Sequence, residues 1–95
     1  MSELRLMLFV AGDTPRSREA EANLARACSE LLASGVHIET VDVLLQPDRA
    51  DEYRILTTPT VVRDGTPPRA RVTGDLSDAT KVLAALSLFA SPQPT

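Results

Sequence analysis

The chain has 95 residues and a formal net charge of -3, with 43% hydrophobic and 24% charged residues. This length supports one domain with a modest core, and the slightly acidic balance argues against a nucleic-acid-binding protein, which usually carries a basic stripe. Cys28 is the only cysteine, so an intramolecular disulfide and a CxxC redox pair are excluded, and a reducing cytoplasm is the expected location. The apolar stretch Leu6–Gly12 is too short to span a membrane, and no membrane partner is expected.

The N-terminal half predicts a strand, a helix and a second strand. Leu4–Val10 is a near-continuous apolar run, typical of a strand that is buried on both faces. Thr14 is a good N-cap before a proline, so we expect a helix over Pro15–Ala33, with Gly35 at its C-terminal left-handed position. Val36–Leu44 then predicts the second strand. The two strands should be parallel, because a helix connects them as a crossover.

The next segment predicts a short helix and then a hairpin. Gln46–Arg54 is polar and begins beside a proline, and we expect one or two helical turns there. Thr60–Arg63 predicts the third strand, and Asp64-Gly65 is the residue pair most favoured in a tight hairpin turn. Arg69–Thr73 would return as an antiparallel fourth strand. Because Pro67 and Pro68 cannot donate ladder hydrogen bonds, that strand should be an edge strand or start late.

The C-terminal part predicts one more helix and a short tail. Ser77 or Asp75 would cap a helix over about Asp78–Phe89, and residues 91–95 would form a frayed end. The inward side chains of that helix would be Val82, Leu83, Leu86 and Phe89. The order β-α-β-(α)-β-β-α predicts one α/β domain over residues 1–90. Its four-stranded mixed sheet would carry helices on both faces, which is the thioredoxin-like order.

Thr58-Pro59-Thr60 precedes the third strand, where thioredoxin-like proteins place a cis proline beside their redox cysteines. Two interpretations stay open: a cis Pro59 that presents the backbone of Thr58 to a peptide or thiol, and a trans proline that only starts an edge strand. The redox positions fall in Ala11–Ser17 and contain no thiol. Ser17 could imitate a glutathione-activating serine, but a capping role for Thr14 and Ser17 is the favoured interpretation.

The remaining polar candidates favour structural roles. Cys28 falls on the apolar stripe of the first predicted helix and should be a small buried hydrophobe. His37 has no carboxylate or cysteine at ligand spacing, so we expect no metal and no cofactor. The acidic side chains Asp48, Asp51 and Glu52 would form a solvated helix face or, as the second possibility, a docking surface.

Three arginines, Arg63, Arg69 and Arg71, flank the predicted hairpin. An exposed row of guanidinium groups would suit carboxylates on a protein partner. The same charges would also protect a bare strand edge from pairing with other chains. Both roles are compatible.

Several segments together resemble the KaiB family of the cyanobacterial circadian clock. Three of them occur in the family's order: LFVAGDTPRS (Leu8–Ser17), TTPT (Thr57–Thr60) and GDLSDATKVL (Gly74–Leu83). VDVLLQPDRADEYRIL (Val41–Leu56) is similar to the family's strand-then-helix segment. The resemblance covers nearly the whole chain, and Gly-Asp-Leu-Ser-Asp with the following Lys-Val-Leu is specific in combination.

The resemblance implies a protein without catalytic residues that binds the hexameric ATPase KaiC, helps reverse KaiC phosphorylation and sequesters KaiA. It also implies two folds, a resting tetramer of order βαββααβ and a monomeric thioredoxin-like state that binds KaiC. Related domains serve as the sensor domain of a clock histidine kinase. We place the docking surface at Arg63, Arg69, Arg71, Asp48 and Arg54, and we assign turn or fold-switch roles to Pro59, Asp64, Gly65, Gly74 and Asp75.

One segment departs from the family pattern. Where clock KaiB proteins usually carry an apolar, proline-spaced LPLP-like stretch, this chain has Asp64-Gly65-Thr66-Pro67-Pro68. Because Asp-Gly favours a hairpin, our hypothesis is a bias toward the thioredoxin-like state, as a monomer or as a dimer through another surface, instead of the tetramer. Two alternatives remain open: a glutathione-binding or glutathione-transferase-like enzyme, and a thioredoxin-fold adaptor with an unknown partner.

Overall fold

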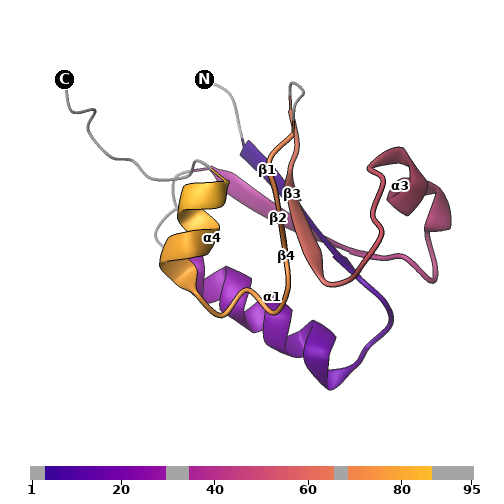
Figure 1. Ribbon diagram of the computed structural model, residues 1–95, viewed down its shortest axis with the longest axis horizontal. Helices are drawn as coiled ribbons and strands as arrows, with labels where there is room; N and C mark the ends of the chain where they lie inside the picture. The colour runs from indigo at the N-terminus through magenta and orange to yellow at the C-terminus, as the bar shows by residue number, and fades with distance from the viewer. Residues whose placement is uncertain (1–3, 30–34, 66–68, 87–95) are drawn as a thin grey trace.

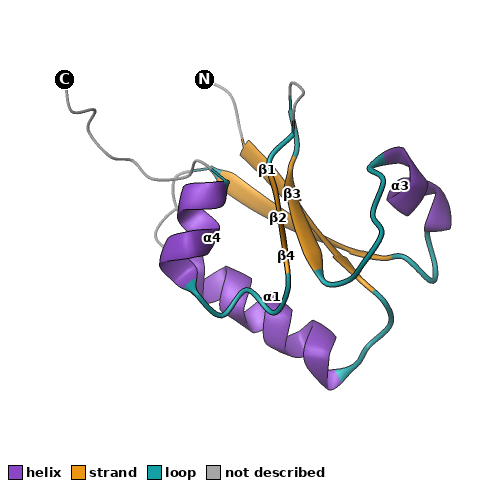
Figure 2. Ribbon diagram, in the orientation of Figure 1, coloured by secondary structure: helices purple, strands orange, loops and turns teal. Residues whose placement is uncertain are grey.

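A computed structural model describes residues 4–29, 35–65 and 69–86 of the chain. Its strands form one mixed sheet in the order β2-β1-β3-β4 (Figures 1 and 2). Strand β1 (Leu4–Val10) pairs in parallel with β2 (Val36–Asp42) and antiparallel with β3 (Thr60–Arg63). Strand β4 (Arg71–Thr73) pairs antiparallel with β3 at the sheet edge. The predicted α/β fold class and the parallel first pair are confirmed.

The helices lie on both faces of the sheet, as the sequence predicts. Helices α1 (Pro15–Ala27) and α4 (Ala79–Ala85) cover one face, and α3 (Pro47–Glu52) lies on the other (Figure 1). Alternate side chains of β1 divide between the two layers, because successive residues of a strand point to opposite faces. The core on the α1 side includes Leu6, Leu8, Val10, Leu24, Val61 and Val82, and the core on the α3 side contains Met7, Phe9, Val41 and Val62.

The first helix begins where the sequence predicts and ends earlier. The hydroxyl of Thr14 accepts a hydrogen bond from the backbone N–H of Ser17 at 3.1 Å, which confirms the N-cap. The helix ends at Ala27, and the predicted end at Ala33 lies outside the described residues. Cys28 forms the C-cap, with its N–H bonded to the Leu24 carbonyl at 3.0 Å.

The second strand is also shorter than predicted, because Asp42 turns the chain. Its Oδ1 accepts hydrogen bonds from the backbone N–H groups of Gly12 at 3.0 Å and Leu44 at 2.9 Å. Val43 still donates to the Val10 carbonyl at 2.8 Å, but the strand proper ends at Asp42. The same carboxylate thereby fixes the loop between β1 and α1.

The prediction of a tight two-residue hairpin turn at Asp64-Gly65 is wrong. The N–H of Arg63 bonds to the Ala70 carbonyl at 2.9 Å, so residues 64–69 connect the two strands and β4 starts only at Arg71. A two-residue turn would have placed Pro67 and Pro68 opposite the residues of β3. Proline cannot donate the ladder hydrogen bonds that those positions require, which explains the longer connection.

The cap of the last helix is Asp78, and the predicted caps Asp75 and Ser77 are wrong. The Asp78 Oδ1 accepts from the N–H of Lys81 at 3.1 Å, while Asp75 instead accepts from the N–H of Ser77 at 3.0 Å. The chain therefore makes one more local turn before the helix starts. Val82 and Leu86 are buried and Leu83 is partly buried, as predicted, whereas Phe89 and the tail lie outside the described residues.

Substituting Asp78 by alanine should remove the N-cap of α4 and lower the free energy of unfolding by about 1 kcal/mol. Urea unfolding of the wild type and the variant measures this difference. The control is Ser77→Ala, an exposed neighbour that does not cap the helix, and it should change the stability by less than about 0.5 kcal/mol. Equal losses in the two variants would contradict the assignment of the cap.

Candidate partner-binding surface

Tyr53 joins the short helix α3 to the sheet. Its ring lies 5.6 Å from the ring of Phe9 at an interplanar angle of 44°, and both rings belong to the α3-side core. The Tyr53 hydroxyl donates to the Asp64 Oδ1 at 3.1 Å. The guanidinium of Arg69 lies 5.1 Å from the Tyr53 ring centroid, a cation–π distance, and its Nε is 3.8 Å from the same Asp64 oxygen. One aromatic side chain thus holds together the end of α3 and both ends of the β3–β4 connection.

Arg71 ties the edge strand to the end of α3. Its Nη2 donates to the carbonyl of Tyr53 at 2.6 Å, and its Nη1 donates to the carbonyl of Arg54 at 3.1 Å. These carbonyls follow the last turn of the helix, where backbone acceptors otherwise lack partners and a cation is favoured. Arg71 therefore supports the helix position.

Arg63 lies on the other face of the sheet. It shares that face with Val61, which packs in the α1-side core, and its Nη1 donates to the Leu86 carbonyl at 2.9 Å. The structure therefore does not bring the three predicted arginines into one row. Arg69 and Arg71 lie beside Tyr53, whereas Arg63 bonds to the cap residue of α4.

Asp48 and Arg54 are the predicted residues that this surface presents outward. Both are exposed, Asp48 in the first turn of α3 and Arg54 just after it, in a left-handed conformation with φ of 55°. Their side chains form no hydrogen bond or ion pair with the other described residues. They share this outward exposure with Asp51 and Glu52 of the same helix.

Three exposed leucines flank α3, and the sequence analysis did not identify them as surface residues. Leu44 and Leu45, between β2 and α3, are 69% and 78% exposed, and Leu56, between α3 and β3, is 93% exposed. Large apolar side chains with this exposure are typical of interaction surfaces when they gather around one element. The sequence could have indicated this surface, because the three leucines lie on both sides of the polar segment Pro47–Arg54. Leu44 was instead assigned to the end of the second strand.

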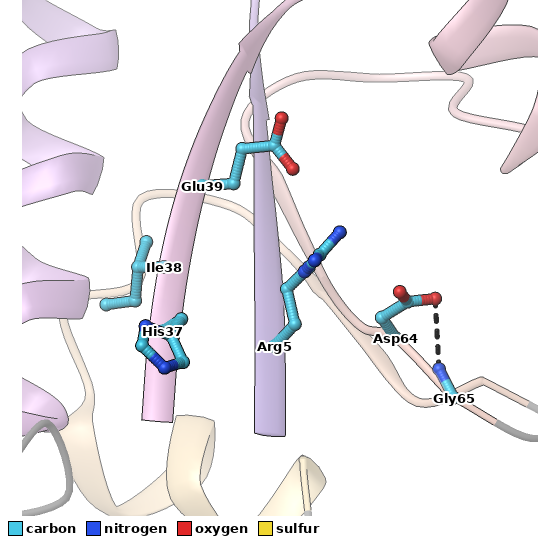
Figure 3. Close-up of a pocket in the computed structure, with 6 residues that line it drawn as sticks. All are labelled: Arg5, His37, Ile38, Glu39, Asp64 and Gly65. Atoms are coloured by element: carbon cyan, nitrogen blue, oxygen red, sulfur yellow. Dashed lines mark hydrogen bonds between the residues drawn. The ribbon is translucent and has the colours of Figure 1, made fainter. Parts of the chain in front are cut away.

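A shallow concavity of about 700 Å³ opens on the same face of the sheet (Figure 3). Its walls carry both signs of charge, from Arg5, Glu39 and Asp64, together with the imidazole of His37, while Ile38 points toward the helices. Arg49 of α3 donates to both carboxylate oxygens of Glu39, at 3.1 and 3.2 Å. This hydrogen-bonded guanidinium lowers the pKa of Glu39. The concavity therefore suits a partner with mixed charges better than a simple anion.

The end of the sheet that carries redox chemistry in thioredoxins has no thiol here. The Thr58–Pro59 bond is cis, so the trans alternative is wrong, and the hydroxyl of Thr60 donates to the carbonyl of Thr57 at 2.8 Å. Cys28 is fully buried in the α1-side core, and burial raises the pKa of its thiol, as expected for a structural cysteine.

Ser17 gains no support as a glutathione-activating group. It is buried, and its oxygen accepts a hydrogen bond from the Thr14 hydroxyl at 3.0 Å. The small pocket beside it, about 200 Å³, is lined by the carboxylates of Asp13, Glu21 and Asp42. These negative charges would repel an anionic tripeptide, so the pocket disfavours the glutathione-binding alternative.

The junction at Gly74 and Asp75 connects three parts of the fold. Gly74 has φ of 122° and donates its N–H to the carbonyl of Pro59 at 3.0 Å. The carbonyl of Asp75 accepts from the buried side chain of Asn23 at 2.8 Å. Asn23, which the sequence analysis did not single out, thus links α1 to the segment before α4.

Among the described residues, no three histidine, cysteine or acidic side chains converge to hold a metal ion. In the same part of the chain, no helix has the length and apolar character needed to cross a membrane.

Fold and site together define a thioredoxin-fold protein without a redox cysteine pair. The N-terminal domain of SasA from Synechococcus elongatus has a TM-score of 0.73 and 25% identity, over 98% of this chain and 91% of that domain. Mitochondrial thioredoxin 3 of Saccharomyces cerevisiae has a TM-score of 0.71 and 17% identity, over 94% of this chain and 81% of that one. These likenesses confirm the thioredoxin-like architecture.

The chain belongs to the KaiB family, because the KaiB domain model matches residues 7–88. A circadian clock protein KaiB3 from Synechocystis is 41% identical over 88 residues, which cover 93% of this chain and 86% of that protein. A circadian clock oscillator protein KaiB from Prochlorococcus marinus is 46% identical over 85 residues, covering 88% and 80%. The family resemblance seen in the motifs is confirmed.

Replacing Asp64 by asparagine should lower the pKa of Tyr53. Burial, then the hydrogen bond to the Asp64 carboxylate and the negative charge of that carboxylate raise the pKa of Tyr53 above its ordinary value. The substitution removes the charge and leaves a weaker acceptor, while burial stays. The pKa should therefore fall toward about 10 without reaching it. Tyrosinate absorbance measures this directly, since Tyr53 is the only tyrosine. Glu19→Gln on the exposed side of α1 is the control, and an unchanged Tyr53 pKa in Asp64→Asn would contradict the contact between the Tyr53 hydroxyl and the Asp64 carboxylate.

Proposed function

We propose that this chain is a non-enzymatic binding module that docks on a KaiC-type hexameric ATPase and modulates its phosphorylation and ATPase cycle. The observation that carries the proposal is the match to the KaiB domain over residues 7–88 in a thioredoxin-like arrangement whose redox positions hold no thiol. A clock histidine kinase and a KaiA-like protein are further candidate partners. The buried, unpaired Cys28 is compatible with action in the cytoplasm.

The docking surface in this proposal is α3 with its two flanking connections. It combines the outward charges of Asp48 and Arg54 with the exposed leucines at 44, 45 and 56. Apolar contacts surrounded by charged side chains are the usual composition of a specific protein interface. Arg69 and Arg71 act on this surface by holding Tyr53 and the end of α3 in place. Arg63 lies on the opposite face, where it bonds to the Leu86 carbonyl at the end of α4.

Reversing the two outward charges should weaken docking. Asp48→Arg and Arg54→Glu should each raise the Kd for the host's KaiC-type ATPase, measured with ATP by size-exclusion chromatography with light scattering, by about tenfold, or 1.4 kcal/mol. Glu19→Arg reverses a charge on α1 by the same amount and should leave the Kd unchanged. Absence of any complex with the wild type would overturn the proposed function, and equal effects of all three variants would overturn the proposed surface.

We also propose that Asp64 and Gly65 bias the chain toward this fold, although they do not form the tight turn. The Asp64 carboxylate accepts hydrogen bonds from the Tyr53 hydroxyl and from the N–H of Gly65, the latter at 3.0 Å. Gly65 has φ of 140°, a conformation that other residues rarely adopt. Interactions made in only one of two folds shift the balance by their free energy, tenfold for each 1.4 kcal/mol.

The double substitution Asp64→Leu with Gly65→Pro should therefore shift the chain toward the resting fold. We expect the share of tetramer, measured by light scattering, to rise at least tenfold relative to the wild type. Backbone chemical shifts of Val61–Arg63 report the state directly, because these residues are in a strand here. A wild type in which these residues give helical shifts would contradict the proposed bias.

A further inference from the structure

Strand β2 leaves one long edge of the sheet without a neighbour in the described part of the chain. It has seven residues, and it pairs with β1 on one side only. The opposite edge differs, because β4 has three residues and its Arg71 is bonded back to the end of α3. An edge strand of this length is a template for an additional strand.

A groove lies beside this edge, between β2 and α1. It has a volume of about 710 Å³, and its apolar lining comes from Ala22 and Ala25 of the helix and from Val36 and Ile38 of the strand. The small helix side chains leave room for apolar groups of a strand that would pair with β2. The groove and the edge together point to an extended partner segment, and the sequence of β2 indicates which one.

A second copy of β2 fits this edge in one register. Two copies related by a two-fold axis perpendicular to the sheet keep their α1 sides on one face of the joined sheet. In such an antiparallel pair, the residue at the axis lies opposite the same residue of the other copy. Centring on Glu39 would place two carboxylates opposite each other. Centring on Thr40 would place the carboxylate of Asp42 against Ile38.

Centring on Ile38 removes both of these conflicts. Ile38 then faces Ile38, and Val36 faces Thr40 twice, all on the side of the apolar groove. On the α3 side, His37 faces Glu39 twice, an opposite-charge or hydrogen-bonded pair. Glu39 already accepts from Arg49 of its own chain, but a carboxylate has enough lone pairs for a second donor.

We propose that two copies of this chain associate through antiparallel pairing of their β2 edges, centred on Ile38, to form one continuous sheet. The inference goes beyond the proposed docking on an ATPase and does not depend on it. Strand β4 is at the opposite edge of the sheet from β2, and its Arg71 is bonded to the carbonyl of Arg54, so the dimer leaves β4 and Arg54 open to another partner. A failure of dimerisation would therefore leave the docking proposal intact.

Cysteine cross-linking tests the register directly. In this pairing the two copies of residue 38 are directly opposite, within the range of a disulfide, whereas the two copies of residue 40 are offset by ~13 Å along the strands. Ile38→Cys should therefore give a covalent dimer with diamide as oxidant, and Thr40→Cys should not. Cys28 is buried and should not compete. Equal cross-linking of the two variants, or none in either, would overturn the proposed register.

Charge substitutions test the same pairing without cysteine. His37→Glu places a carboxylate opposite Glu39 twice and should raise the dimer Kd at least tenfold in sedimentation equilibrium. His37→Lys places a hydrogen-bond donor with a charge opposite to that of Glu39 at this position and should not raise the Kd. Thr73→Glu adds the same charge as His37→Glu to the opposite edge and should leave the Kd unchanged. A wild type that stays monomeric at all concentrations, or equal Kd values for the two His37 variants, would overturn the proposal.

Discussion

The burial of β1 on both faces is the constraint on which the rest of the structure depends. Leu6, Met7, Leu8 and Phe9 are fully buried, so two layers of side chains must cover the strand. Alternation sends Leu6 and Leu8 to α1 and α4, and Met7 and Phe9 to the side of α3. A shift of one residue in its pairing would exchange the two layers, which is why the register with β2 and β3 is specified so strongly.

The two layers are unequal, and the difference explains where a partner can bind. The α1 side has two helices and the larger core, whereas α3 has six residues, none of them buried. The α3 layer is held instead by Tyr53 and Ile55 against the sheet and by Arg71 at the end of the helix. Within the helix, Arg49 bonds to Glu39 of β2, and the remaining charged residues of α3 stay exposed. Asp48 and the leucines on its two sides are therefore available for contacts with another protein.

The sequence was sufficient where one local pattern determined the outcome. The apolar run of β1 and the Thr14-Pro15 start of α1 were predicted to the residue, as was Thr60–Arg63. It was insufficient where two local signals competed. Asp64-Gly65 favoured a tight turn, but the prolines that follow cannot donate ladder hydrogen bonds. The strands therefore pair beyond the prolines, with Arg63 bonded to Ala70. The same competition made Asp78 the cap, because Asp75 is used for the preceding turn.

The candidate site was harder to predict, because it depends on which face each side chain occupies. The three arginines near the hairpin looked equivalent along the chain, but Arg63 shares a face with Val61 and the other two lie beside Tyr53. That assignment needs the antiparallel register of β3 with β4, which follows from the length of the connection. The sequence signals gave the length of this connection wrongly, and the faces of the three arginines could therefore not be told apart.

The two edges of the sheet differ in what they leave open, and this difference bears on the two proposed binding roles. The β4 edge has only three residues, and Arg71 donates its hydrogen bonds to carbonyls at the end of α3, which holds this edge to the helix. At the β2 edge, seven residues run beside an apolar groove, and their charges complement a second copy of the same strand. Neither edge requires a thiol at the start of α1. A sheet with one edge held to a docking helix and the other open to self-pairing could assemble copies of the chain while each presents α3 to a larger partner.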